Sequence, residues 1–360
     1  MPDPFQEALA RHRAGDLVGA ERAYRAALAA GPNVNALGNL GLLLWRTGRL
    51  EEAEATLRAA AEAAPEMAAL HYNLGRFLHS VERFPEAEAR LREAIRLDPG
   101  LPNARLDLGN LQLAMGQLSE GWALFEERPE RRNSPARQLP FPEWRGEDLA
   151  GKRLLVWREQ GLGDQIFAAR FLQGTGAASV TLATLPSLSR LLAPLVDDVM
   201  LAVGDVFFGQ HDYWALPLSL PRWAAAAQAP YLHGSPRRSG RIGVVWRGNP
   251  RPDPGRSLDP AQAARLLALP GAICLHPEDT GARDLQDTAD LIAGLDVVVT
   301  IDTSVAHLAG AMGKRTIVLL QRYCSDWRWT LDWYPSVEII KQPTPGDWAA
   351  VVDAVAARLG

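Results

Sequence analysis

The sequence contains little cysteine and almost no lysine. Its two cysteines, Cys274 and Cys324, form neither a CxxC pair nor a metal-ligand set, so we expect reduced thiols and no structural disulfide. Of the 38 basic residues only Lys152, Lys314 and Lys341 are lysines. The formal net charge of −4 argues against a surface that coats nucleic acid, because phosphate binding needs a clustered cationic excess. The net charge of the whole chain does not exclude a local pocket lined by arginine.

Long apolar runs are also missing. The N-terminal stretch MPDPFQEALARHRAG has no apolar core typical of a signal peptide, and no later stretch has the roughly 18 uninterrupted apolar residues of a membrane span. We therefore expect a soluble, cytoplasmic protein with no membrane span and no nucleic-acid partner. With 360 residues and 47% hydrophobic content, the chain can fill more than one core, so we expect two or three domains.

Residues 1–130 repeat with a period of about 34 residues, the length of a tetratricopeptide repeat. Small, large and proline positions recur in register: Ala8, Gly41, Gly75 and Gly109; Ala20, Ala53, Ala87 and Gly121; Tyr24, Leu57, Leu91 and Phe125; Pro32, Pro65 and Pro99. Small residues let two helices approach closely, and stacked helix pairs bury the apolar stripe that one pair leaves exposed. The pattern predicts about four helix pairs, which either bind an extended peptide or only dock on a neighbouring domain.

Strands alternate with helices in the rest of the chain, after a Pro- and Arg-containing linker at residues 131–150. The expected strands are 153–157, 178–183, 198–203 and 212–220 in one module, and 241–246, 271–276, 296–302, 315–320 and 336–340 in the next. This alternation predicts two consecutive modules with mostly parallel sheets, at residues 151–235 and 236–360. Ligands bind outside the carboxyl ends of such strands, so the space between the modules is the expected active site.

The turn after the first of these strands has the sequence EQGLGDQI. It lacks the third glycine of the dinucleotide-binding GxGxxG motif, because Ile166 stands there, so a nicotinamide enzyme is unsupported. Asp164 stands where a helix begins. Its carboxylate either caps the free amides of that helix or acts as a general base, and the two roles can coexist only if one oxygen stays free.

Two segments of the second module are candidates for binding phosphate. The loop WRGNPRPDPGRS offers Arg247, Arg251 and Arg256, which bind a phosphate or form a solvated basic loop. In VVVTIDTSVAHLAG an apolar strand ends at Asp302, and Thr303 with Ser304 opens a helix whose first amides attract phosphate. Asp302 is expected to bind sugar hydroxyls or to orient the loop. His307, in the same helix, is either part of this site or a core histidine.

DTSVAHLAGAMGKRTIVLL and its flanking segments, with EQGLGDQIFAARFL and VVWRGNP…RS upstream, resemble bacterial glycosyltransferase family 9, the heptosyltransferase-related enzymes, in the branch that carries tetratricopeptide repeats. The resemblance implies a helical solenoid followed by a GT-B pair of Rossmann-like modules. It also implies a nucleotide-sugar co-substrate held by the C-terminal module, an acceptor facing the N-terminal module, and no metal or other cofactor.

The resemblance further implies roles for individual residues. Asp164 is the candidate base. The donor-binding residues are Arg247, Gly248, Asn249, Arg256, Ser257, Asp302, Thr303, Ser304 and His307, and the acceptor-side loop holds Glu159, Gln160, Gly161 and Gly163. Apart from the resemblance, the tryptophans near the C-terminus either stack on a base or sugar or, as we expect, pack the C-terminal helix onto its sheet; they are Trp327, Trp329, Trp333 and Trp348.

The leading hypothesis is transfer of a sugar to a Ser or Thr hydroxyl of a protein that the repeats bind. Inversion is implied by the resemblance alone. A flagellin-like acceptor is suggested by the same resemblance. Two alternatives stay open: transfer to a saccharide or lipid-linked glycan, and a non-catalytic repeat scaffold with a degenerate transferase domain.

Overall fold

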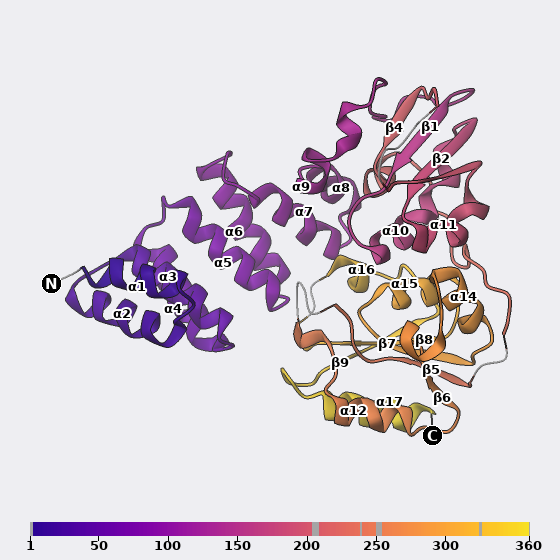
Figure 1. The fold of residues 1–360 in the computed structure, drawn as a ribbon. Helices are drawn as coiled ribbons and strands as arrows, with labels where there is room; N and C mark the ends of the chain where they lie inside the picture. The colour runs from indigo at the N-terminus through magenta and orange to yellow at the C-terminus, as the bar shows by residue number, and fades with distance from the viewer. Residues whose placement is uncertain (1–2, 204–208, 238–239, 250–253, 324–325, 360) are drawn as a thin grey trace. The chain divides into compact units, whose positions relative to one another are not determined.

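The computed structural model describes residues 3–203, 209–237, 240–249, 254–323 and 326–359 (Figure 1). The chain divides into two compact units. The repeat unit comprises Met1–Glu127 with Ser325–Leu331, and the α/β unit comprises Arg128–Cys324 with Asp332–Gly360. Within the described residues, no helix is both long and apolar enough to cross a membrane.

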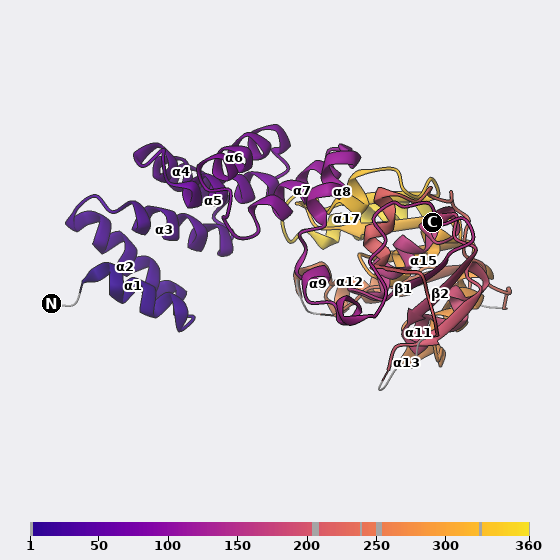
Figure 2. The ribbon, with the colours of Figure 1, turned by 90° about the horizontal axis from the view of Figure 1, so that it is seen from above.

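The repeat unit consists of antiparallel helix pairs stacked in series (Figure 2). Its helices are α1 (Pro4–Arg13), α2 (Leu17–Ala30), α3 (Val34–Arg46), α4 (Leu50–Ala63), α5 (Ala68–Ser80), α6 (Phe84–Leu97), α7 (Ala104–Ala114) and α8 (Leu118–Phe125). A Cβ added at Gly41 would lie 2.6 Å from Cγ of Leu57, and one at Gly75 would lie 2.9 Å from Cγ of Leu91. These glycines thus let the two helices of each pair pack closely, as the repeat pattern predicts.

A segment from the end of the chain completes the repeat unit. Helix α16 (Trp327–Thr330) packs against α7, and the Trp327 ring lies edge-on to Trp122 with ring centroids 5.0 Å apart. Trp327 is 2% exposed. The expectation that Trp327 packs the C-terminal helix onto its sheet is therefore wrong, because the last helix pair has no following repeat and α16 covers its apolar side. For Trp348, which lies in the core beneath the second sheet, the same expectation is confirmed.

The first sheet of the α/β unit is parallel, with the order β3-β2-β1-β4. Its strands are β1 (Arg153–Trp157), β2 (Ser179–Thr184), β3 (Asp198–Leu201) and β4 (Tyr213–Ala215). The short α9 (Pro129–Arg132) leads into the 131–150 segment, which then runs beside β4, where Trp144 N donates to Trp214 O at 2.7 Å. Ala136, from the same segment, joins Leu155 and Trp214 in the core. This segment therefore completes a module that is otherwise small.

The second sheet is also parallel, with the order β6-β5-β7-β8-β9. Its strands are β5 (Ile242–Val245), β6 (Ala272–Cys274), β7 (Val297–Ile301), β8 (Thr316–Leu320) and β9 (Val337–Lys341). The strands β5, β7 and β8 are buried throughout, which explains why each is a continuous run of apolar residues. Each of the nine expected strands has a counterpart, and the predicted alternation is confirmed. The strand expected at residues 212–220 is shorter, because only Tyr213–Ala215 is strand and a 3-10 helix follows at Pro217–Arg222.

Helices cover both faces of the second sheet. Figure 1 shows α12 (Pro260–Leu267) and α17 (Trp348–Leu359) on one side, and α14 (Leu285–Ala293) and α15 (Ser304–Ala311) on the other. The short α13 (Pro277–Thr280) follows β6. Two helices of the first module, α10 (Leu162–Ala168) and α11 (Pro186–Leu192), pack against α15 and α14 respectively. The carboxyl ends of β1 and β7, which lead into α10 and α15, thereby meet where the modules join.

Candidate active site

The turn between β1 and α10 carries the predicted base. Backbone N of Gly161 donates to Oδ2 of Asp164 at 2.9 Å, so one carboxylate oxygen closes the turn. Gln160 has a φ of 54°, a left-handed conformation that residues with a side chain rarely adopt. The N-cap residue is therefore Gly161 and not Asp164, which stands three residues on and caps by bonding back to the Gly161 amide. Its role as a base stays a prediction.

Glu159, placed in the acceptor-side loop by resemblance, is 6% exposed and lies in a buried ion pair. Its Oε2 accepts from Nε of Arg128 at 2.8 Å and its Oε1 from Nη2 of Arg128 at 2.9 Å. Oε1 also accepts from the backbone N of Leu218 at 2.8 Å. Because both oxygens are used inside the α/β unit, Glu159 anchors the turn, and Gln160, Gly161 and Asp164 remain its half-buried or exposed part.

The turn between β7 and α15 lies directly against the Asp164 turn. A Cβ at Gly163 would lie 2.8 Å from Cδ2 of His307 and 3.6 Å from Cα of Ser304. Thr303 is the N-cap of α15 but makes no side-chain capping bond; its Oγ1 lies 3.2 Å from Oγ1 of Thr300. The first amides of α15 therefore remain without a capping side chain, as an anion-binding helix start requires.

The loop after β5 adds donors beside Thr303. A Cβ at Gly248 would lie 3.2 Å from Cγ2 of Thr303 and 3.4 Å from Nη2 of Arg256. Backbone N of Gly248 donates to Oγ of Ser257 at 3.2 Å, and Nη2 of Arg256 donates to O of Asn249 at 2.8 Å. Nε of Arg256 is buried and has no hydrogen-bond partner in the described part of the chain. A ligand oxygen would satisfy it.

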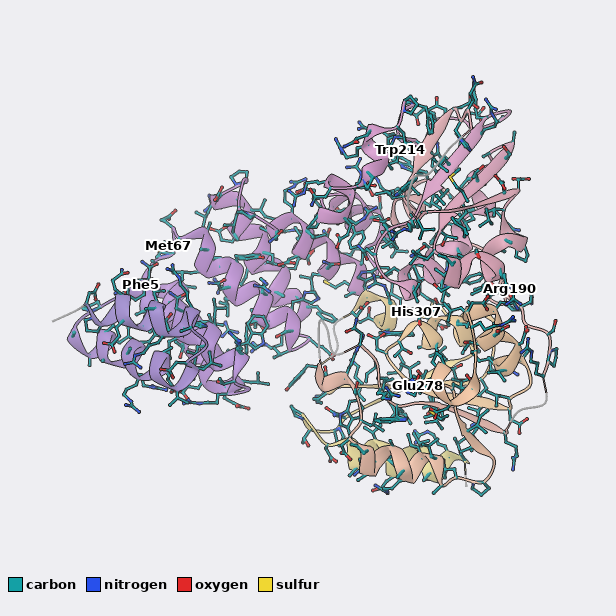
Figure 3. The ribbon with its side chains drawn as sticks, viewed as in Figure 1. Phe5, Met67, Arg190, Trp214, Glu278 and His307 are labelled. Atoms are coloured by element: carbon teal, nitrogen blue, oxygen red, sulfur yellow. The ribbon has the colours of Figure 1, made fainter. Side chains whose placement is uncertain are left out.

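Arg247, from the same loop, stands apart from that cluster. Arg247 is exposed, pairs with Glu278 (labelled in Figure 3) and stacks on Trp246. It would have to leave Glu278 to bind a phosphate. Arg251 lies outside the described residues.

His307, also labelled in Figure 3, is 4% exposed, and its Nδ1 lies 3.1 Å from Oη of Tyr334. Its ring also packs edge-on against Phe167 of α10, with centroids 6.5 Å apart. His307 is therefore a core histidine whose edge contacts the Asp164 turn, and its part in donor binding stays a prediction. Asp302 is half-buried at the end of β7.

Two further polar residues escape the sequence analysis. Gln165 is 4% exposed; its Oε1 accepts from Oγ1 of Thr184 at 3.1 Å, while its Nε2 has no partner among the residues described. His276, after β6, packs edge-on against Trp246, and burial, helped by the charge of Arg247, lowers its pKa. No sequence motif marks Gln165, since its position in α10 is indistinguishable from a core position. His276 could have been found from its place after a strand.

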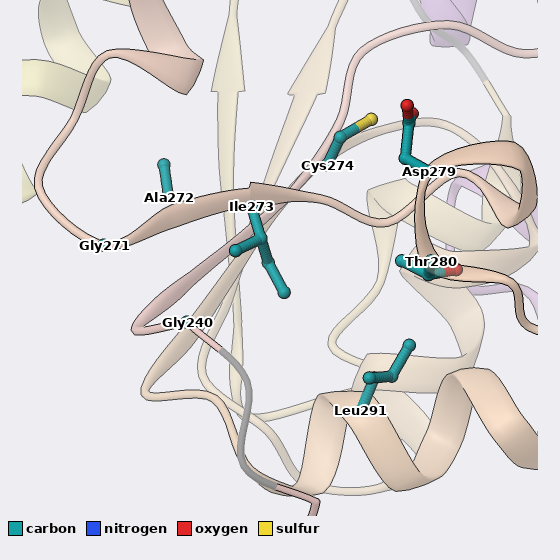
Figure 4. A pocket seen from close by; sticks show the side chains of 8 residues that line it. All are labelled: Gly240, Gly271, Ala272, Ile273, Cys274, Asp279, Thr280 and Leu291. Atoms are coloured by element: carbon teal, nitrogen blue, oxygen red, sulfur yellow. The ribbon is translucent and has the colours of Figure 1, made fainter.

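A cavity of about 600 Å³ opens at the β6 edge of the second sheet (Figure 4). It is lined by Gly240, Gly271, Ala272, Ile273, Cys274, Asp279, Thr280 and Leu291. Burial raises the pKa of the Cys274 thiol, which keeps it protonated and unreactive at neutral pH. The cavity adjoins the loop that holds His276. Within the described ranges, no three His, Cys, Asp or Glu side chains gather as metal ligands would.

Comparison with known families finds matches in both parts of the chain. Tetratricopeptide repeat families match residues 5–68, 39–102 and 78–139, and glycosyltransferase family 9 (heptosyltransferase) matches residues 280–336. The family 9 match includes the β7–α15 turn described above. The repeats and the family resemblance inferred from the sequence are therefore confirmed.

A curated relative, Protein FlbA of Caulobacter vibrioides, is 27% identical over an alignment that covers 69% of this chain and 53% of FlbA. The chain thus spans about half the length of that relative. Among solved structures, the MamA protein is 25% identical over 37% of this chain and 74% of MamA, with a TM-score of 0.33. Pseudomonas aeruginosa PilF is 25% identical over 33% of this chain and 57% of PilF, with a TM-score of 0.31.

Proposed function

Because this chain carries tetratricopeptide repeats followed by a glycosyltransferase family 9 domain, we propose that it transfers a sugar from a nucleotide-sugar donor to a Ser or Thr hydroxyl of a protein. The repeats bind the acceptor protein, a flagellin-like chain being one candidate, and the α/β unit performs the transfer. Transfer proceeds with inversion at the anomeric carbon.

In the proposed reaction Asp164 acts as the general base. Its carboxylate takes the proton from the acceptor hydroxyl as the hydroxyl oxygen attacks the anomeric carbon. The bond between that carbon and the phosphate oxygen breaks, and the electron pair leaves with the nucleoside diphosphate. Oδ2 accepts from the Gly161 amide at 2.9 Å, which fixes the carboxylate that is assigned this proton in the turn between β1 and α10.

The leaving diphosphate is assigned to the cluster beside Thr303. Nε of Arg256, the amides that open α15 and the Ser304 hydroxyl supply donors in one place. Donors fixed before the reaction stabilise developing negative charge without the cost of reorienting, which is the task a cation performs in metal-dependent transferases. Metal independence is part of the proposal, and turnover should persist after dialysis against a chelator.

One observation carries the proposal: Gly163 lies against His307 and Ser304, so the turn with Asp164 and the helix start with Thr303 face one site. A base and a phosphate-binding helix start must lie within one sugar ring of each other to act on the same bond. The two turns are 140 positions apart in the chain and come from different modules, so the folded α/β unit alone brings them together.

The test is Asp164→Asn in the full-length chain. We expect nucleoside diphosphate binding to be nearly intact and turnover to fall by about 10²-fold or more, the scale of a lost general base. Asp259→Asn is the matched control, since Asp259 also caps a helix, α12, and asparagine caps equally well. Unchanged turnover in Asp164→Asn would remove Asp164 from this role.

The same preparation distinguishes the alternatives. Mass spectrometry of protein and saccharide acceptors, incubated with a donor panel, reports which acceptor gains a sugar. Transfer to saccharide alone would replace the protein acceptor in the proposal. If no nucleoside diphosphate raises the Tm of the chain, the scaffold alternative prevails, because a ligand that binds the folded state must stabilise it.

A further inference from the structure

A buried ion pair holds the Asp164 turn, and its arginine is the residue that directly follows the repeats. Arg128 comes after Glu127, where the main segment of the repeat unit ends, and itself belongs to the α/β unit. It is 1% exposed, which is rare for an arginine. Its Nε donates to Oε2 of Glu159 at 2.8 Å, and its Nη2 donates to Oε1 of Glu159 at 2.9 Å. Two parallel hydrogen bonds between planar groups fix the orientation of the Glu159 carboxylate as well as its distance.

A third segment of the α/β unit joins this ion pair. It is the 3-10 helix Pro217–Arg222, which packs against α10. Nη2 of Arg128 also donates to Oγ of Ser219 at 2.8 Å, and the backbone N of Leu218 donates to Oε1 of Glu159 at 2.8 Å. The guanidinium, which has several donors in fixed directions, thus connects the end of the repeats with the Asp164 turn and with this 3-10 helix.

The backbone directly after Glu159 is strained. Gln160 has a φ of 54°, in the left-handed region that residues other than glycine rarely adopt. Such a conformation persists only where the neighbouring structure fixes the chain on both sides. On one side, Glu159 is fixed by Arg128; on the other, the Gly161 amide donates to Oδ2 of Asp164 at 2.9 Å. If Glu159 is released, Gln160 can relax to a more favourable conformation, and the carboxylate of Asp164 moves with it.

We propose that Arg128 is a positioning residue for the Asp164 turn, and that it acts through Glu159 and the strained backbone at Gln160. The inference rests on the proposed function, in which Asp164 takes the proton of the acceptor hydroxyl. Arg128 lies outside both sheets, as the N-cap of α9, and follows the part of the chain that is assigned to the acceptor protein. The geometry of the base thus depends on the residue that follows the repeats, and not only on the sheets of the α/β unit.

A buried ion pair also contributes to stability, so the test must separate stability from positioning. Replacing Arg128 alone would leave the Glu159 carboxylate buried without this partner, which destabilises a fold whatever the role of the pair. The double variant Arg128→Met/Glu159→Gln avoids this cost. Methionine fills the space with an unbranched apolar chain, and the glutamine keeps an oxygen that can accept from the Leu218 amide.

The experiment compares this double variant with the unmodified chain, both at full length and labelled with 15N. We expect the Gly161 amide of the double variant to exchange with solvent about tenfold faster, because its hydrogen bond to Asp164 opens when the turn relaxes. The amides of β1 are the reference for global stability, since a general loss of stability would speed their exchange as well. If Gly161 exchange changes no more than that of β1, Arg128 does not position the turn.

The matched control is the double variant Arg131→Met/Glu143→Gln. Arg131 and Glu143 form a pair of the same geometry, with Nε donating to Oε1 at 2.9 Å and Nη2 donating to Oε2 at 2.7 Å. That pair connects α9 with the segment beside β4. We expect the control to leave both Gly161 exchange and turnover unchanged. An equal effect of the two double variants would overturn the proposal, because any ion pair near α9 would then serve as well.

Kinetics distinguish this inference from the proposed function. If transfer occurs, we expect Arg128→Met/Glu159→Gln to lower kcat about tenfold while KM for the donor stays unchanged, because only the geometry of the base is altered. Faster Gly161 exchange in a chain that transfers no sugar would refute the transferase and retain the positioning of the turn. A transferase whose kcat and Gly161 exchange are both unchanged by the double variant would retain the proposed function and refute the role of Arg128.

Discussion

At the scale of single residues, Gly163 determines how closely the two turns approach. A Cβ added at Gly163 would lie 2.8 Å from Cδ2 of His307, which is shorter than the contacts that real Cβ atoms make. The His307 ring is fixed by the contact of its Nδ1 with Oη of Tyr334. Neither the Gly163 turn nor the His307 ring can move apart without a shift of the backbone. The glycine is thus required for proximity and not for an unusual backbone conformation.

We therefore predict that Gly163→Ala lowers turnover by about 10²-fold, because it moves the Asp164 turn away from the helix start at Ser304. The added methyl should also destabilise the fold by about 1–3 kcal/mol through overpacking. Gly209→Ala is the control, since a Cβ there meets no atom within 4 Å. Steady-state kinetics and thermal unfolding check both effects; equal turnover in the two variants would contradict the close contact.

At the scale of elements, α16 is a four-residue helix that ends the repeat stack. Asp326 caps it by accepting from backbone N of Arg328 at 2.9 Å, and Arg328 stacks on the Trp327 ring. So short a helix has almost no stability of its own. Its structure therefore depends on the burial of Trp327 against Trp122 and Phe125.

Trp327→Ala should destabilise the repeat unit by about 3–5 kcal/mol, the usual cost of removing a buried tryptophan. The measurement is hydrogen exchange, in which amides of α7 and α8 should lose protection while those of α1 and α2 keep it. Trp223→Ala, at a tryptophan that is 43% exposed, should change neither. Unaltered protection of α7 would mean that α16 does not close the stack.

At the scale of the whole chain, ion pairs join elements that are far apart in sequence. Arg190 of α11 (labelled in Figure 3) donates to Oδ2 of Asp284 at 2.9 Å and to Oδ1 of Asp287 at 3.2 Å, both on the α14 side of the module junction. Hydrogen bonds from Arg283, and then Arg190, hold the pKa of Asp287 well below its usual range. Only strong acid would therefore protonate Asp287 and weaken its ion pair with Arg190 across the module junction.

The sign of the pH effect follows from that lowered pKa. Asp287 stabilises the folded state fully above the ordinary aspartate pKa of about 3.9, and the contribution is lost as the pH falls through the lower folded-state value. The denaturant midpoint of Asp287→Asn should thus lie below that of the unmodified chain at pH 7, with the gap narrowing below about pH 4. Asp296→Asn, at an exposed ion pair with Arg241, should show little gap. A gap that does not change with pH would exclude the charge as its cause.

The boundary between the repeat unit and the α/β unit is not a single point in the sequence, which affects how truncations should be designed. Arg128 directly follows the repeats but pairs with Glu159 inside the α/β unit, while α16, from the second half of the chain, belongs to the repeat unit. Deleting residues 1–130 would leave Glu159 without its partner and Trp327 without its pocket. A buried charge stripped of its partner costs about 3–5 kcal/mol, so point variants in the full chain are the better test of the repeats.

The sequence alone determined the features that depend on local order. The 34-residue spacing of Gly41, Gly75 and Gly109 predicted the helix pairs, because close helix packing needs small residues at a fixed phase. The apolar runs predicted β5, β7 and β8, because a strand buried on both faces must be apolar along its length. The turns with Asp164 and Thr303 were found for the same reason, since each follows such a strand and opens a helix.

Only the tertiary structure decided which distant residues meet. The contact of Gly163 with His307, the pairing of Arg128 with Glu159 and the docking of Trp327 on the last repeat each join segments far apart in the chain. None has a spacing that a sequence pattern could reveal. Local periodicity determines which face of a helix or strand is apolar, whereas a contact between two elements depends on how the whole chain folds.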